Sequence, residues 1–119
     1  MSTISTHVLD TALGRPVTGI RVSLERVESR SDARVATVMT TRLGARTTDT
    51  NGRIPALADS PIDPGTYHIR FETSDYFSRT DRPVFYPEVV VTIRIDAADE
   101  HFHIPLLLSP FGYSTYRGS

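Results

Sequence analysis

The segment Pro64-Gly65-Thr66-Tyr67-His68-Ile69-Arg70-Phe71-Glu72 carries the pattern that decides the fold. After the Pro-Gly turn signal, apolar and polar side chains alternate from Tyr67 to Glu72. Successive side chains of a β-strand point to opposite faces, so this alternation predicts a strand with one face in the core and the other in solvent.

The same period of two recurs along most of the chain and predicts further strands at residues 20–25, 35–41, 89–95 and 101–108. Turn signals such as Asn51-Gly52 separate these segments. About seven short strands at this spacing are typical of a β-sandwich. A short helix is expected within Thr73–Asp81, and the polar segment Glu28–Arg34 is expected to form an exposed loop.

Length and composition narrow the functional classes. The 119 residues suit one domain, spanning residues 1–119. There is no cysteine, and all 13 cationic residues are arginine, which excludes thiolate, Schiff-base lysine and P-loop chemistry. The net charge of −1 favours neither nucleic acid nor a membrane surface. With no leader-like or membrane-length apolar segment, we expect a cytoplasmic protein.

Histidines supply the first candidate site. His101 and His103 are two residues apart on a predicted strand, so both point to one face. Together with His7, from the first predicted strand, they could form a three-histidine zinc site. The same imidazoles titrate near neutrality and could instead act as acid and base, or simply lie at the surface.

Two further segments carry groups suited to binding an anionic or carbonyl-rich molecule. Arg53 follows the Asn51-Gly52 turn, and its guanidinium could clamp a planar substrate. The last four residues, Tyr116-Arg117-Gly118-Ser119, follow a predicted buried strand and could be held in place as one wall of a site.

Several motifs occur in a fixed order along the chain. They are Thr6-His7-Val8-Leu9-Asp10-Thr11 with Gly14-Arg15-Pro16, Asn51-Gly52-Arg53-Ile54, Asp75-Tyr76-Phe77, Phe85-Tyr86-Pro87-Glu88, residues 100–110, and residues 112–119. With them, the whole chain resembles the transthyretin-like family, and specifically its enzymatic branch, the 5-hydroxyisourate hydrolases. The final tetrapeptide is absent from transthyretin proper.

The resemblance implies a fold, an assembly and a reaction. The fold is an all-β, transthyretin-like sandwich of two four-stranded sheets with one short helix. Four chains form a dimer of dimers, with the sites in the channel between dimers. The implied enzyme converts 5-hydroxyisourate and water to 2-oxo-4-hydroxy-4-carboxy-5-ureidoimidazoline, a step of urate degradation, without a metal or other cofactor.

The resemblance also implies roles for individual residues. His101, which shares a strand face with His103, is expected to support the site without touching the substrate. The implied catalytic residues are His7, Arg53, His103 and Ser119. The implied substrate-binding residues are His7, Arg53, Tyr116, Arg117 and Gly118.

Two other functions compete with this one. A transthyretin-like carrier would hold a small aromatic ligand, although a carrier has no need of the histidine and arginine set. A metal-dependent hydrolase would use His7, His101 and His103 as ligands. The segment Glu28–Thr48 is also longer than this fold requires, and we interpret it as an extended surface hairpin.

Overall fold

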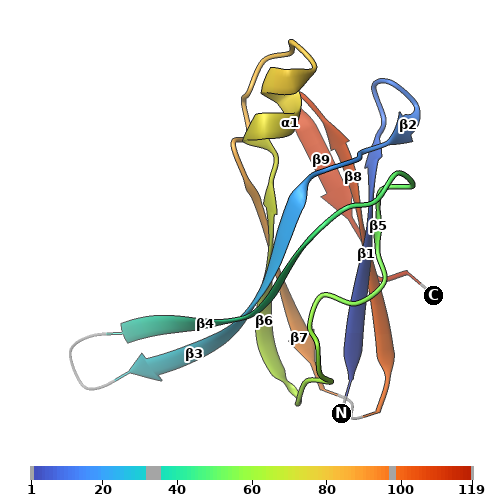
Figure 1. Cartoon of the computed structure of the whole chain (residues 1–119). Coiled ribbons are helices and arrows are strands. Elements are labelled where there is room, and N and C mark those ends of the chain that lie inside the picture. Colours follow the sequence, from blue (N-terminus) through green and yellow to red (C-terminus); the bar gives the residue numbers. More distant parts are fainter. Residues whose placement is uncertain (1, 32–35, 97–98, 119) are drawn as a thin grey trace.

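Two β-sheets face each other, and one short helix lies at one end of the sandwich (Figure 1). The computed structural model describes residues 2–31, 36–96 and 99–118. The prediction of a two-sheet β-sandwich with a single short helix is confirmed. The elements are β1 (Thr3–Asp10), β2 (Arg15–Pro16), β3 (Arg21–Ser31), β4 (Ala36–Thr47), β5 (Arg53–Ile54), β6 (Gly65–Glu72), α1 (Ser74–Arg79), β7 (Val89–Ile95), β8 (His101–Ser109) and β9 (Gly112–Thr115).

The first sheet has the strand order β2-β1-β8-β9, and the two-residue β5 also pairs with β1. This short strand is an addition to the four strands expected. The central strands β1 and β8 run parallel, with Thr3 opposite His101 and Asp10 opposite Leu108. Strands β2 and β5 pair with different parts of β1, at its residues 9–10 and 6–7. Segments near the two ends of the chain thus form the middle of this sheet.

The second sheet has the order β4-β3-β6-β7 and is antiparallel throughout. Strands β3 and β4 extend past the end of β6 as the predicted long hairpin, which projects from the sandwich (Figure 1). The expectation of a loop at Glu28–Arg34 is wrong for residues 28–31, which continue β3. Residues 32–35 lie outside the described part of the chain.

The core lies between the two sheets and follows from the alternation in the sequence. Apolar side chains from one face of each central strand are buried against those of the opposite sheet. Their burial removes apolar surface from water, which is the main favourable term in folding. The central members are Ile4, Val8, Val22, Leu24, Tyr67, Ile69, Phe71, Phe102, Leu106 and Leu108.

A buried polar cluster joins the helix end of the sandwich to β1. The carboxylate of Asp10 is fully buried and accepts hydrogen bonds from the Tyr76 hydroxyl at 2.6 Å, the Arg82 guanidinium and the Leu13 amide. Burial by itself raises the pKa of Asp10, but these hydrogen bonds and the charge of Arg82 outweigh it and hold that pKa below its ordinary value. In the described residues, no helix is long and apolar enough to span a membrane.

Candidate active site

The outer face of the first sheet, away from the core, carries most of the residues expected in the site. Alternation in β1 and β8 sends every second side chain to this face. The parallel pairing then places each β1 residue beside a partner on β8. The paired positions are Thr3 with His101, Ser5 with His103, and His7 with Pro105.

His7 and Arg53 are direct cross-strand partners on β1 and β5. The turn before β5 fixes this pairing, because the Asp49 carboxylate accepts the Arg53 amide at 2.9 Å. Gly52 has a φ of +74°, and a Cβ there would lie 2.5 Å from the carbonyl oxygen of Val8, so the turn requires glycine. The Arg53 guanidinium has no hydrogen bond or ion pair with any residue that the structure describes, which leaves it available to a ligand.

A continuous series of hydrogen bonds links two hydroxyls and two imidazoles on this face. The Thr3 hydroxyl lies 2.6 Å from Nδ1 of His101. The Ser5 hydroxyl lies 2.9 Å from Nε2 of His101 and 2.7 Å from Nδ1 of His103. The sequence prediction that His101 and His103 share one face is therefore confirmed, and Ser5 lies between them.

Burial lowers the pKa of the His103 imidazole, and the positive charge of Arg53 lowers it further. His7 and His101 act in the same direction. The lowered pKa favours the neutral form of the imidazole, whose Nδ1 is engaged by Ser5. A neutral ring of this kind is suited to accept a proton.

The C-terminal segment continues the β8–β9 pairing and brings Gly118 against His103. In the last residue pair of β9, Leu106 lies opposite Thr115. A further bridge joins His103 to Gly118, three residues farther along each segment, so the register is unchanged. Proline lacks an amide hydrogen, so Pro105 interrupts the ladder between the two points. The Gly118 amide donates to the His103 carbonyl at 2.7 Å. A Cβ at Gly118 would lie 2.8 Å from Cδ2 of His103, so only glycine allows this approach.

The other residues of the terminal tetrapeptide have different surroundings. The Arg117 guanidinium donates to Glu100 at 2.8 Å and lies 4.4 Å from the ring centroid of Phe102, a core residue. Arg117 therefore anchors the segment, and its predicted contact with substrate stays a prediction. Tyr116 is exposed, and Ser119 lies outside the described residues.

A cavity of about 260 Å³ opens on this face. It is small compared with the pockets that hold drug-sized ligands. Arg53 also borders a second cavity, of about 430 Å³, which is lined in part by Arg46 and Thr47 of β4. The 260 Å³ cavity is lined by Ser5, Thr6, Arg53, Ile54, Pro55, His101 and His103.

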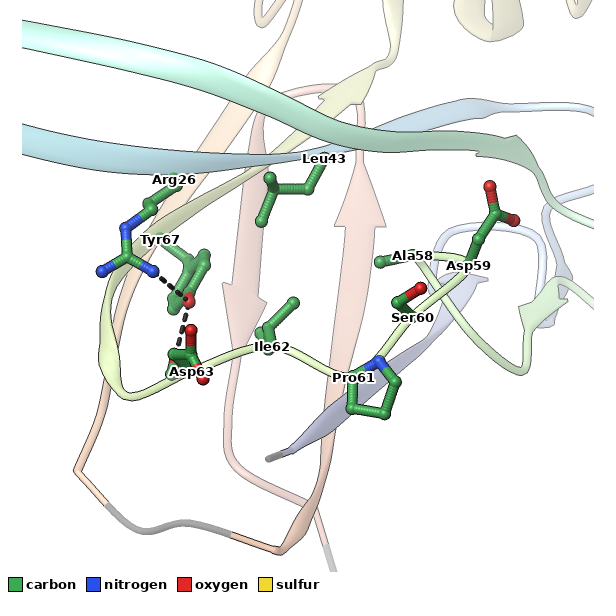
Figure 2. Close-up of a pocket in the computed structure, with 9 residues that line it drawn as sticks. All are labelled: Arg26, Leu43, Ala58, Asp59, Ser60, Pro61, Ile62, Asp63 and Tyr67. Carbon is green, nitrogen blue, oxygen red and sulfur yellow. Dashed lines mark hydrogen bonds between the residues drawn. The ribbon is translucent and has the colours of Figure 1, made fainter.

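Another cavity, of about 380 Å³, lies between the β3–β4 hairpin and the loop at residues 58–63 (Figure 2). Two of its polar side chains are already paired: Arg26 donates to the Tyr67 hydroxyl at 3.3 Å, and Tyr67 donates to the Asp63 backbone carbonyl at 2.5 Å. None of the histidines that the structure describes lines it. The outer face of the first sheet is therefore the better candidate for chemistry.

The geometry does not favour the three-histidine metal site. A metal ligand must offer a free ring nitrogen. Both nitrogens of His101 are engaged by hydroxyls, Nδ1 by Thr3 and Nε2 by Ser5. Within the described residues, no group of three or more histidine, aspartate or glutamate side chains is arranged to hold a metal ion.

Comparisons with known proteins identify the family of the chain. The model of the HIUase/Transthyretin family matches residues 4–118. The chain belongs to this family. A 5-hydroxyisourate hydrolase of Mus musculus is 41% identical over 119 residues, which cover 99% of this chain and 96% of the mouse protein.

Solved structures of the family show the same fold. The 5-hydroxyisourate hydrolase of Klebsiella pneumoniae superposes with a TM-score of 0.82 at 35% identity and full coverage of both chains. Sea bream transthyretin, solved in complex with thyroxine, gives the same TM-score of 0.82 at 22% identity, covering 98% of this chain and 94% of its own. At 22% identity, the likeness to sea bream transthyretin shows a shared fold only.

Sequence reasoning did not identify Ser5 and Thr3 as part of the site. A signal for both was present, because they lie two and four residues before His7 and so share its face of the strand. Their neighbours on β8 were not predictable in the same way. The register that sets Ser5 beside His103 joins residues 98 positions apart.

Proposed function

We propose that this protein hydrolyses 5-hydroxyisourate to 2-oxo-4-hydroxy-4-carboxy-5-ureidoimidazoline. The observation that carries the proposal is the His7–Arg53 pair beside His103, whose pKa is lowered. The family supports it, because its relatives at about 40% identity are named 5-hydroxyisourate hydrolases over nearly their full length. The reaction opens a ring amide with one molecule of water.

The described residues suit the three needs of this reaction: a base, a charge stabiliser and an acid. His103 is the best candidate for the base, because its lowered pKa favours the neutral ring, which can accept a proton from water. The Arg53 guanidinium, which has no hydrogen-bond or ion-pair partner among the described residues, stabilises the negative charge that develops on the carbonyl oxygen. His7, paired with Arg53, supplies the proton that the ring nitrogen takes as the C–N bond breaks.

The C-terminal segment forms one wall of the proposed site. Gly118 packs on the His103 ring and limits its movement. Tyr116 is exposed and free to contact the rings of the substrate. We keep Arg117 and Ser119 as proposed contributors, with Arg117 also holding the segment in place through Glu100 and Phe102.

We further propose that four copies assemble as a dimer of dimers in the cytoplasm. Strands β7 and β9 are the last strands of their sheets, and unpaired edges favour pairing with another copy. An aromatic cluster lies beside these edges, with Phe85, Tyr86, Phe111 and Tyr113 in ring contact and two of the four more than 60% exposed. Exposed apolar patches of this kind mark interaction surfaces. A second interface over the outer face of the first sheet would enclose the site.

The test is direct turnover. 5-Hydroxyisourate, generated in situ from urate with urate oxidase, should decay faster in the presence of the protein, in proportion to its concentration. Decay at the uncatalysed rate, together with saturable binding of a small aromatic ligand, would favour the carrier function instead.

A further inference from the structure

Ser5 occupies an unusual position, because its hydroxyl meets a ring nitrogen on each side. The distances are 2.7 Å to Nδ1 of His103 and 2.9 Å to Nε2 of His101. Ser5 is only 8% exposed, so its polar groups depend on protein partners. In the described part of the chain, its hydroxyl has no other hydrogen-bond partner.

This arrangement restricts the protons on both rings. A hydroxyl has one proton to donate, and a neutral imidazole has one nitrogen that donates and one that accepts. If Ser5 donates to Nδ1 of His103, it accepts from Nε2–H of His101, and both rings carry their proton on Nε2. If Ser5 donates to Nε2 of His101, it accepts from Nδ1–H of His103, and both rings carry their proton on Nδ1. A hydroxyl that accepted from both rings would leave its own proton buried without an acceptor.

We propose that Ser5 is a positioning residue that fixes the orientation and tautomer of His103, and that it couples this tautomer to that of His101. In the state with both protons on Nδ1, Nε2 of His103 is a free base. In the other state, Nε2 carries a proton and cannot accept one. Thr3 completes the series. Its hydroxyl donates to Nδ1 of His101 when the ring protons are on Nε2, and accepts from Nδ1–H of His101 when they are on Nδ1.

The coupling has a consequence for activity, because only the state with both protons on Nδ1 leaves Nε2 of His103 free to accept a proton. The charged or titratable groups that act on His103 are His7 on β1, Arg53 on β5 and His101 on β8. The Arg117 guanidinium of the C-terminal segment is paired with Glu100 and lies over Phe102.

The first test needs no substrate, so it does not depend on the proposed hydrolase function. Nitrogen NMR of histidine-labelled protein at neutral pH should show His101 and His103 in the same tautomer. In Ser5→Ala, the His103 signals should move to an average of both tautomers, and Ser5→Thr, which keeps the hydroxyl, should restore the wild-type signals. Opposite tautomers in the wild-type protein, or unchanged signals in Ser5→Ala, would overturn the inference.

The second test, which rests on the proposed function, is kinetic. Ser5→Ala should lower kcat by roughly 10- to 100-fold through misorientation of His103, with KM nearly unchanged. It should also shift the acid limb of the pH profile, and Ser5→Thr should recover most of both. Ser23→Ala, which removes a buried serine hydroxyl from the second sheet, is the matched control and should keep wild-type kinetics. Equal losses in Ser5→Ala and Ser23→Ala with no change in the pH profile would mean that Ser5 is merely structural. If the wild-type protein had no activity, the NMR result would still decide the inference.

Discussion

Replacing Gly118 by alanine tests whether the C-terminal segment is seated on His103. A Cβ at this position meets Cδ2 of His103 at 2.8 Å and the His103 carbonyl oxygen at 3.2 Å. Carbon atoms attract each other best at about 3.5–4.0 Å, so the ring or the segment must move by roughly 1 Å. A misplacement of about 1 Å can cost on the order of 100-fold in rate. We therefore expect kcat to fall by roughly 10- to 100-fold.

The fold should barely respond to the same change. At most one hydrogen bond, from the Gly118 amide to His103, is lost, which is worth about 1 kcal/mol and lowers Tm by no more than about 8 °C. Gly112→Ala is the matched control, because a Cβ there meets nothing closer than the Ser109 hydroxyl at 3.7 Å, an ordinary contact. Both variants are measured by decay of 5-hydroxyisourate and by thermal unfolding. Equal activity of the two variants would show that the contact of Gly118 with His103 has no role in the reaction.

Three further predictions use the same assay or unfolding measurements. Alanine variants of His7, Arg53 and His103 should each lower kcat by roughly two to four orders of magnitude. His68→Ala, on the other sheet, should change it little, and similar small effects at all four positions would contradict the assignment. Treatment with a chelator should leave the rate unchanged, and a loss that zinc restores would instead support a metal-dependent hydrolase. Asp10→Asn should lower the free energy of unfolding at pH 7 by about 3 kcal/mol, because it leaves the Arg82 charge without its buried partner. The folded-state pKa of Asp10 is lowered, so its contribution is present above about pH 4 and is lost as the pH falls through the folded pKa. Urea titrations at decreasing pH should therefore show the two proteins converging, and a constant difference down to pH 3 would refute this role.

Local patterns in the sequence predicted the parts of the fold that depend on local chemistry. The alternation at 67–72 and 89–95 predicted β6 and β7, because each strand buries one face. The helix expected within Thr73–Asp81 is present as α1. The side-by-side placement of His101 and His103 also followed from the period of a strand.

Features that depend on pairing between distant segments were not predictable from these patterns. The continuation of β3 through Glu28 has no apolar alternation, because beyond β6 the hairpin has no core to cover. The position of Ser5 between two imidazoles requires the parallel register of β1 and β8. The Asp10–Arg82 pair likewise joins positions 72 residues apart.

The parallel pairing of β1 with β8 also has a consequence for how the chain folds. Closing a loop of nearly 100 residues costs chain entropy before any contact repays it, and non-local strand pairing of this kind slows folding. The β3–β4 and β3–β6 pairs join segments closer in sequence and meet a smaller cost. Because His7, Ser5 and His103 come together only when β1 meets β8, the return of enzymatic activity during refolding reports on the closure of that central pair, and not on the formation of β-structure as a whole.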